Sequence, residues 1–252
     1  MSFCVVRCFV ALGLALVSWA APAQSLTVSA AASLTEALKE IGARFEAAHA
    51  GSTLRFNFAA SGVLLQQIAQ GAPADVFVSA DEETVARGIE QKLLDPATRR
   101  LFAGNVVVLI RPQGSMAVKA LADLPRPEVR RIAVGKPASV PVGRYTQQGL
   151  TAAQLWDALQ PKIVPGDSVR QVLDYVARGE VEAGFVYATD AALMAEKVQV
   201  VQTLPGHAPV LYPAVVVADS RQKALARAFV AFLGGAEAQA ILARRGFTNP
   251  DR

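Results

Sequence analysis

The sequence predicts an α/β protein of two lobes, each built on a mainly parallel sheet flanked by helices. Along most of the 252 residues, short apolar runs rich in β-branched residues alternate with longer segments of helical spacing. This alternation is typical of parallel sheets covered by helices. Two apolar strands, at residues 106–110 and 212–218, bracket a middle segment of their own. Two such crossings between lobes would form a two-strand hinge.

The first part of the chain shows three strand–helix repeats. Segment 34–48 carries its apolar side chains at helical spacing along one face, at Leu34, Ala37, Leu38, Ile41 and Phe45. The predicted strands of this part are residues 26–30, 54–58 and 75–78, and the helices that follow them are residues 34–48, 62–70 and 81–91.

After residue 105 the pattern changes. An entirely apolar strand, VVVLI at residues 106–110, precedes a stretch that contains prolines. Further strands are predicted at residues 132–134, 183–187, 198–201 and 212–218, and helices at residues 142–150, 151–159, 169–178, 221–233 and 236–244. We therefore expect a discontinuous first lobe of residues 24–105 plus 212–252. Residues 106–211 would form the second lobe, with hinge strands near 106–110 and 212–218.

Residues 1–23 have the pattern of a cleavable signal peptide. Arg7 precedes the apolar run CFVALGLALV, and Ala21-Pro22-Ala23 fits the small-x-small cleavage pattern. An uncleaved membrane anchor is the alternative, but the run is shorter than the roughly 20 residues that a spanning helix needs. Both cysteines, Cys4 and Cys8, lie in this segment, which excludes disulfides, thiolate metal sites and cysteine nucleophiles from the mature chain. We expect a soluble protein outside the cytoplasm.

Composition and motifs exclude several function classes. The formal net charge is +4, and no basic run exceeds two residues, so the chain lacks the pattern of a nucleic-acid binder. It contains no GxGxxG, GxxxxGK[ST], HExxH or GxSxG motif. The two histidines, His49 and His207, have no third ligand nearby, which does not favour a zinc site. An SxxK at Ser220–Lys223 is better interpreted as the start of a helix.

Polar and small residues gather where strands give way to helices. Ser33, with Glu36 three residues later, and Ser61 are predicted helix N-caps, Pro141 a first helical residue and Asp167 another cap. Helix N-termini present unpaired N–H groups and a partial positive charge, so several that converge form an anion site. The neighbours of Ser33 and Ser61 carry no charge, which suits a fully deprotonated oxyanion because that ligand only accepts hydrogen bonds.

Several motifs resemble those of the periplasmic molybdate-binding proteins of ABC importers. In chain order they are AAASLT at 30–35, GAPADVFVSAD at 71–81, AVG at 133–135, VPVGRY at 140–145, GFVY at 184–187 and RGFT at 245–248. The resemblance runs from about Leu26 to Asn249. It implies a two-lobed periplasmic binding protein fold of type II and a non-enzymatic, monomeric protein without cofactor. Such a protein would hold molybdate or tungstate between its lobes in the periplasm and deliver it to an ABC permease.

The resemblance also implies a set of ligand-binding residues. Ser33 and Ser61 would each give a hydroxyl and a backbone N–H, Val142 and Val169 would give backbone N–H groups, and Tyr187 its phenolic hydroxyl. Position 142 is alanine in many relatives, but a backbone donor survives that change. Residue 62 is glycine where some relatives have serine. Lobe closure would complete the set of donors, and cavity size would select against sulfate.

Other functions remain open at this point. One is a receptor for another anion, such as sulfate or thiosulfate, or for ferric iron, although four tyrosines and two histidines at scattered positions do not indicate an iron site. Another is an exported serine hydrolase that uses Ser33, Ser61 or Ser220, which would lack an adjacent histidine. The third is a scaffold protein with a large exposed apolar patch. Arg144 and Arg170, in predicted first helical turns, are expected to lie on the solvated surface or to steer ligand.

Overall fold

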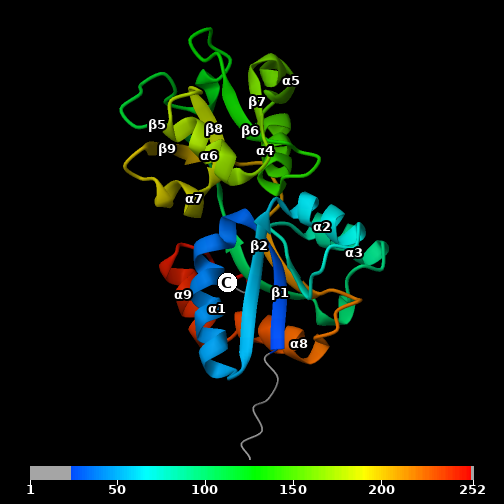
Figure 1. Ribbon diagram of the computed structural model, residues 1–252. Coiled ribbons are helices and arrows are strands. Elements are labelled where there is room, and N and C mark those ends of the chain that lie inside the picture. Colours follow the sequence, from blue (N-terminus) through cyan, green and yellow to red (C-terminus); the bar gives the residue numbers. More distant parts are fainter. Residues whose placement is uncertain (1–23, 251–252) are drawn as a thin grey trace, which may run out of the picture.

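Two lobes, each with one five-stranded sheet, make up the computed structural model, which describes residues 24–250 (Figure 1). The predicted signal peptide lies outside these residues. The first sheet has the order β2-β1-β3-β10-β4, and its strands are β1 (Gln24–Ala31), β2 (Ser52–Ala59), β3 (Val76–Val78), β4 (Arg100–Asn105) and β10 (Val210–Val216). The second sheet has the order β7-β6-β8-β5-β9, and its strands are β5 (Val107–Pro112), β6 (Ile132–Gly135), β7 (Ile163–Gly166), β8 (Ala183–Tyr187) and β9 (Val198–Thr203).

Helices flank both sheets. Those of the first lobe are α1 (Thr35–Ala48), α2 (Ser61–Ala69), α3 (Glu82–Glu90), α8 (Lys223–Leu233) and α9 (Ala236–Arg244). Those of the second lobe are α4 (Pro141–Ala152), α5 (Trp156–Leu159), α6 (Val169–Ala177) and α7 (Ala188–Leu193). Short 3-10 helices occur at η1 (Ala32–Leu34), η2 (Pro96–Thr98), η3 (Leu121–Asp123) and η4 (Gln160–Lys162). Among the residues described, no single helix is long and apolar enough to cross a membrane; α8 and α9 meet that criterion only together, as a pair bent by 55°.

In each sheet four of the five strands run in the same direction, as the sequence predicts, and one strand runs against them. In the first, β1 pairs in parallel with β2 and β3, whereas β10 runs antiparallel to β3 and β4. In the second, β6 pairs in parallel with β7 and β8, whereas β5 runs antiparallel to β8 and β9. The reversed strands, β5 and β10, are the ones that the chain enters directly after each crossing between the sheets. The strand–helix repeats away from the crossings keep the parallel pairing that the sequence predicts.

The chain passes twice between the two sheets. It leaves the first sheet at the end of β4 and enters the second at β5, with Val106 between them, and it returns between β9 and β10. Sequence reasoning missed β4 and β7. The first of these contains arginine, glycine and asparagine, and the second is four residues long with a proline, so neither has the composition of a strand. Pairing with β10 and β6 holds them in place.

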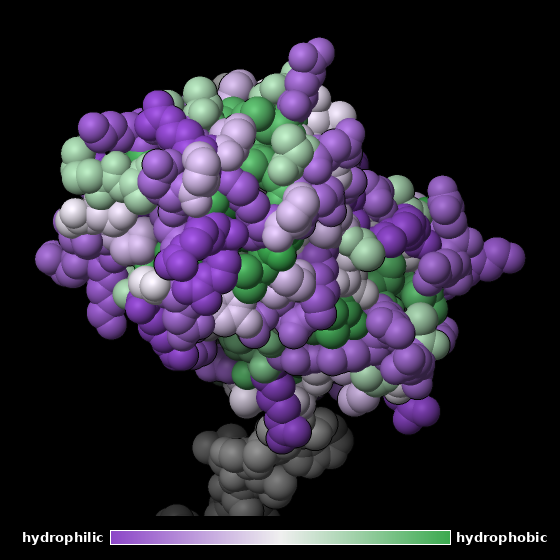
Figure 2. Space-filling view, turned by 90° about the horizontal axis from the view of Figure 1, so that it is seen from above, coloured by the Kyte–Doolittle hydropathy of each residue, from purple (hydrophilic) through white to green (hydrophobic). Residues whose placement is uncertain are grey.

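The core lies between each sheet and its helices. In β1, Leu26, Val28 and Ala30 are fully buried, and the buried face of α1 includes Ile41 and Phe45, as its sequence spacing predicted. On the face in Figure 2, hydrophobic residues form patches separated by hydrophilic ones. The large hydrophobic side chains exposed among residues 24–250 are Met116, Leu193 and Val200. This surface gives no support to the scaffold alternative.

Candidate ligand-binding site

All five residues predicted to bind ligand line one cavity between the lobes. Ser33 and Ser61 belong to the first lobe, and Val142, Val169 and Tyr187 to the second. Each of the five is at most 5% exposed. The rest of the cavity lining is small and apolar: Ala31, Ala32, Ala59, Ala60, Ala80, Val140 and Pro141. The structure thus brings together residues that lie up to 154 positions apart (187 − 33).

The two serines reach the cavity where β1 and β2 end. Ser33 lies in η1, and its Oγ is 3.2 Å from the Tyr212 hydroxyl. Ser61 is the first residue of α2, and its Oγ accepts a hydrogen bond of 3.0 Å from the Ala80 N–H. Because the Ser61 hydroxyl acts as acceptor there, its own hydrogen is available for a ligand. The predicted capping roles of both serines are wrong: the cap residues are Ala31 and Ala60, and the hydroxyls contact Tyr212 of β10 and the Ala80 N–H between β3 and α3 instead.

Two helix N-termini of the second lobe meet these serines. Val142 follows Pro141 at the start of α4, where a proline was predicted, and Val169 begins α6. The first N–H groups of a helix have no acceptor within it, and they carry the positive end of the helix dipole. The cap of α6 is Ser168, whose Oγ accepts from the Gln171 N–H at 3.2 Å. The predicted cap Asp167 is wrong, because its carboxylate pairs with Lys136.

Tyr187 presents an unused donor to the cavity. It ends β8, is 1% exposed, and its hydroxyl has no hydrogen-bond partner among the residues described. Burial raises the pKa of this phenol well above its ordinary value, so the hydroxyl keeps its proton. A buried donor without an acceptor destabilises the protein. A ligand oxygen in the cavity would satisfy it.

The electrostatics of the cavity favour an anion that carries no proton. No charged side chain stands among the described residues that line it. Its polar groups are two serine hydroxyls, a phenol and backbone N–H groups at helix starts, which can all donate. Within residues 24–250, no three His, Cys, Asp or Glu side chains gather to hold a metal ion. The arrangement suits a tetrahedral oxyanion and offers no ligands to a bare cation.

A polar network that sequence reasoning missed supports Ser33 from behind. The Asn105 amide donates to Thr189 Oγ1 at 2.8 Å and to the Tyr212 hydroxyl at 3.2 Å, and its oxygen accepts from the Val106 N–H at 2.8 Å. This network joins the ligand-facing serine, through Tyr212, to the first crossing between the sheets. No local pattern indicates it, since its members come from distant segments.

The lobes are in direct contact around the cavity. The Gly62 N–H donates to the Ser139 carbonyl of the other lobe at 3.0 Å, and a Cβ at position 62 would lie 2.7 Å from that oxygen. The expectation of solvated arginines is wrong. Arg144 forms an ion pair with Asp81, and Arg170 forms one with Glu36, both across the lobes. Their partners lie 63 and 134 residues away in the sequence, beyond the reach of local patterns.

Neither Ser33 nor Ser61 has a general base, and among the described residues no histidine forms a hydrogen bond with any of the three serines considered as nucleophiles. The Ser33 hydroxyl contacts Tyr212, Ser61 contacts the Ala80 N–H, and the Ser220 hydroxyl donates to Asp75 at 2.7 Å. The described histidines bond to backbone carbonyls of neighbouring residues instead. A serine hydrolase requires a base within hydrogen-bond reach of the nucleophile.

Beside the cavity, Asp190 makes stability depend on pH. It is fully buried and 2.7 Å from the Arg170 Nε; burial outweighs the Arg170 charge and raises its pKa to about 7. Between pH 4 and 7 the native state therefore holds a proton that the unfolded chain has released, so this group lowers the free energy of unfolding as pH rises, by on the order of a few kcal/mol.

Urea unfolding between pH 4.5 and 7.5 should show that the difference in free energy of unfolding between wild type and Asp190→Asn changes with pH. A difference that stays flat would contradict this, and Asp157→Asn, at an exposed position, is the control.

Comparisons of sequence and of structure with known proteins identify solute-binding proteins as relatives. Residues 26–248 match the family described as bacterial extracellular solute-binding protein. The molybdate-binding protein ModA of Escherichia coli (strain K12) is 38% identical over 230 residues, which are 88% of each chain. ModA of Haemophilus influenzae is 36% identical over 243 residues, 92% of each chain. The solved structure of the Azotobacter vinelandii periplasmic molybdate-binding protein has a TM-score of 0.79 at 28% identity, and the match covers 89% of this chain and 99% of that one.

The family match spans residues 26–248, the range that contains every segment on which the resemblance was based. The matches confirm the predicted two-lobed fold of periplasmic binding proteins. They also confirm the expectation of a protein that is not an enzyme, because solute-binding proteins hold their solute without transforming it. The chain belongs to the family of bacterial extracellular solute-binding proteins, of which these molybdate-binding proteins are relatives.

Proposed function

We propose that this protein captures molybdate, and tungstate with it, and delivers the anion to the permease of an ABC importer. The observation that carries the proposal is the uncharged cavity between the lobes, into which two serines, two helix N-termini and the unpaired Tyr187 hydroxyl converge. The relatives named as molybdate-binding proteins support the same ligand. The anion is cargo and not a cofactor.

In this proposal five residues hold the anion by neutral hydrogen bonds. Ser33 and Ser61 donate hydroxyl and backbone hydrogens from the first lobe, Val142 and Val169 donate backbone N–H groups, and Tyr187 donates its phenol. The starts of α2, α4 and α6, each equivalent to about half a positive charge, would balance a dianion in part. Phosphate is disfavoured because its remaining proton needs an acceptor, and the described lining contains no carboxylate. Sulfate, which is smaller, would leave some of these buried donors unpaired.

The proposed working cycle is closure of two lobes about the crossings. Residues 24–105 plus 212–252 would move against residues 106–211. The change of sheet between β4 and β5, and again between β9 and β10, supports these boundaries. We place the mature protein in the periplasm as a monomer, after removal of residues 1–23, with the permease as a transient partner and no nucleic acid. The family description as extracellular supports export.

Isothermal titration of the mature protein with molybdate, tungstate, sulfate and phosphate tests the function. The protein is first unfolded, dialysed and refolded, and its residual molybdenum and tungsten are measured by mass spectrometry. We expect one-to-one binding of molybdate and tungstate, with sulfate and phosphate silent. Binding of sulfate in preference to molybdate would transfer the assignment to the sulfate alternative. Silence of all four anions in metal-free protein would refute the proposal.

A further inference from the structure

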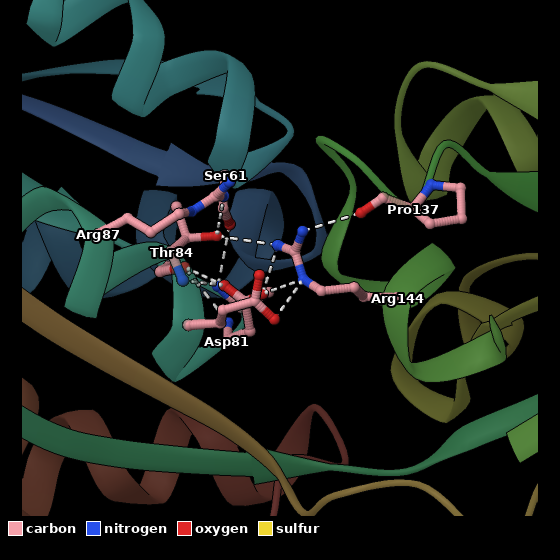
Figure 3. Close-up of polar contacts among 9 residues, drawn as sticks. Ser61, Asp81, Thr84, Arg87, Pro137 and Arg144 are labelled. Atoms are coloured by element: carbon pink, nitrogen blue, oxygen red, sulfur yellow. Dashed lines mark hydrogen bonds and ion pairs between the residues drawn. The ribbon is translucent and has the colours of Figure 1, made fainter. Parts of the chain in front are cut away.

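Arg144 reaches from the second lobe to Asp81 and Thr84 of the first lobe and does not line the ligand cavity. Figure 3 shows its side chain extending toward Asp81 and Thr84. Its Nη2 and Nε donate to Asp81 Oδ2 at 2.6 and 3.0 Å, and Nη2 also lies 3.0 Å from Thr84 Oγ1. The two side chains are 12% and 4% exposed. This is a nearly buried, charge-assisted contact, which is the strong class of hydrogen bond.

The acceptor is held in place independently of Arg144. Asp81 caps α3, and its Oδ1 accepts from the Thr84 N–H at 3.2 Å and from the Ser79 hydroxyl at 3.0 Å. Its Oδ2 is therefore free to receive the guanidinium. Asp81 also follows Ala80, whose N–H bonds to Ser61 Oγ. The acceptor of the Arg144 contact and the N–H that bonds the ligand-facing Ser61 thus belong to adjacent residues, Asp81 and Ala80.

The second lobe offers Arg144 an unfavourable electrostatic environment. Arg144 lies in the first turn of α4, where the helix dipole disfavours a positive charge. Its contact there is with the Pro137 carbonyl, at 2.8 Å, which orients the guanidinium. The carboxylates near it, Asp81 and Glu83, both belong to the first lobe. Its charge is compensated only when the lobes meet.

Arg170 repeats this placement on the other helix that reaches the cavity. It follows Val169 at the start of α6 and pairs across the lobes with Glu36 at 2.6 Å. This pair is more exposed, at 25% and 39%, and Arg170 also has Asp190 as a partner in its own lobe. Exposed pairs contribute less than buried ones because water screens them. The Arg144 contact is therefore the stronger of the two.

We propose that Arg144 and Asp81 form a latch that holds the lobes closed without touching the ligand. The role of the latch in ligand retention rests on the proposed function, because it assumes that the anion is enclosed by closure. Neither residue lines the cavity. The pair forms as the lobes meet, so it stabilises the closed state and slows the release of ligand. The affinity would then depend on residues outside the set of ligand donors.

Two variants test the latch, and a third serves as matched control. Arg144→Gln removes the donor. Asp81→Asn removes the acceptor charge but keeps an oxygen to cap α3, which protects folding. Arg227→Gln removes the same charge from an exposed pair with Asp95 within the first lobe, so it changes the net charge of the protein as Arg144→Gln does. We expect Kd for molybdate to rise about tenfold in both latch variants, within the usual range of coupling between sites, and not in the control.

The rates and the lobe positions separate a latch from a general structural role. Stopped-flow measurements should place the loss in the dissociation rate, since release requires opening. The range 24–252 lacks cysteine, so Thr53→Cys and Glu128→Cys, at exposed positions in different lobes, can carry a fluorescent donor and acceptor. Single-molecule energy transfer should show a smaller closed population in Arg144→Gln than in Arg227→Gln. The double variant Arg144→Gln/Asp81→Asn should be no worse than either single variant.

Two results would overturn the latch. One is an unchanged dissociation rate together with an unchanged closed population in both variants. The other is additive losses in the double variant, which would mean that the two residues act separately. The energy-transfer measurement is also made without ligand. If wild-type protein failed to bind molybdate, the proposed function would fall, but a shift of the lobes between Arg144→Gln and its control would still decide the latch.

Discussion

Replacing Gly143 by alanine is expected to destabilise the second lobe by about 3 kcal/mol or more. Gly143 is the third residue of α4, and an added Cβ would stand 1.9 Å from the carbonyl oxygen of Gly135 and 2.5 Å from its carbon. Both atoms are backbone at the end of β6, so no side-chain rotation relieves the overlap. The helix would have to move away from the strand, and with it the Val142 N–H at the cavity.

Urea unfolding of the ligand-free protein measures this loss. Gln147→Ala, on the same helix and partly exposed, is the control and should change the free energy of unfolding by less than about 0.5 kcal/mol. A Gly143→Ala protein as stable as wild type would mean that α4 can shift on β6 at little cost. The close contact of the two glycines would then not be what positions this helix.

The parts of the fold that the sequence predicts are those in which local pattern and tertiary contacts agree. The buried face of α1 and the apolar strand β10 follow directly from residue spacing. β4 does not, because its stability comes from pairing with β10 and from the exchange of hydrogen bonds between Gly104 and Thr248. Strand propensity depends on such neighbours, which a single segment does not reveal.

The sequence predicts which residues line the cavity better than it predicts the hydrogen bonds that those residues form. Family motifs named Ser33 and Ser61, and both line the cavity. Residue patterns assigned them capping roles, because a serine before a helix usually caps it. The structure gives their hydroxyls to Tyr212 and to the Ala80 N–H, 179 and 19 residues away. A local sequence pattern contains only the serine's neighbours in the chain, so it gives no information on partners from distant segments that the fold places beside it.

Local sequence patterns also fail to predict the ion pair of Arg144. In the sequence, Arg144 stands among residues of α4 with no carboxylate at helical spacing, so exposure was the natural expectation. Its partner Asp81 stands at the start of the helix predicted over residues 81–91, and in the structure it caps α3. A carboxylate has two oxygens, however, and the second one serves the other lobe. The sequence does contain one indication of this pair: a positive charge in the first turn of a helix is unfavourable unless an anion lies close to it.

Under the proposed function, Ser61→Ala is expected to raise the Kd for molybdate about 100-fold. A hydrogen bond to a charged group contributes about 1.5–3 kcal/mol, and removal of one partner inside a buried site leaves the other unsatisfied. Ser61 is fully buried, so no water can take the place of its hydroxyl. The variant also deprives the Ala80 N–H of its acceptor, which loosens the segment that carries Asp81.

Ser220→Ala is the control that separates ligand binding from stability. Ser220 is 7% exposed in the same lobe, and its hydroxyl donates to Asp75 at 2.7 Å, away from the cavity. Both variants lose a hydrogen bond of a buried serine, so their free energies of unfolding should fall by similar amounts. Only Ser61→Ala should lose affinity in titration calorimetry. Equal affinities in the two variants would show that the Ser61 hydroxyl serves the lobe alone and that the anion is held by the remaining donors.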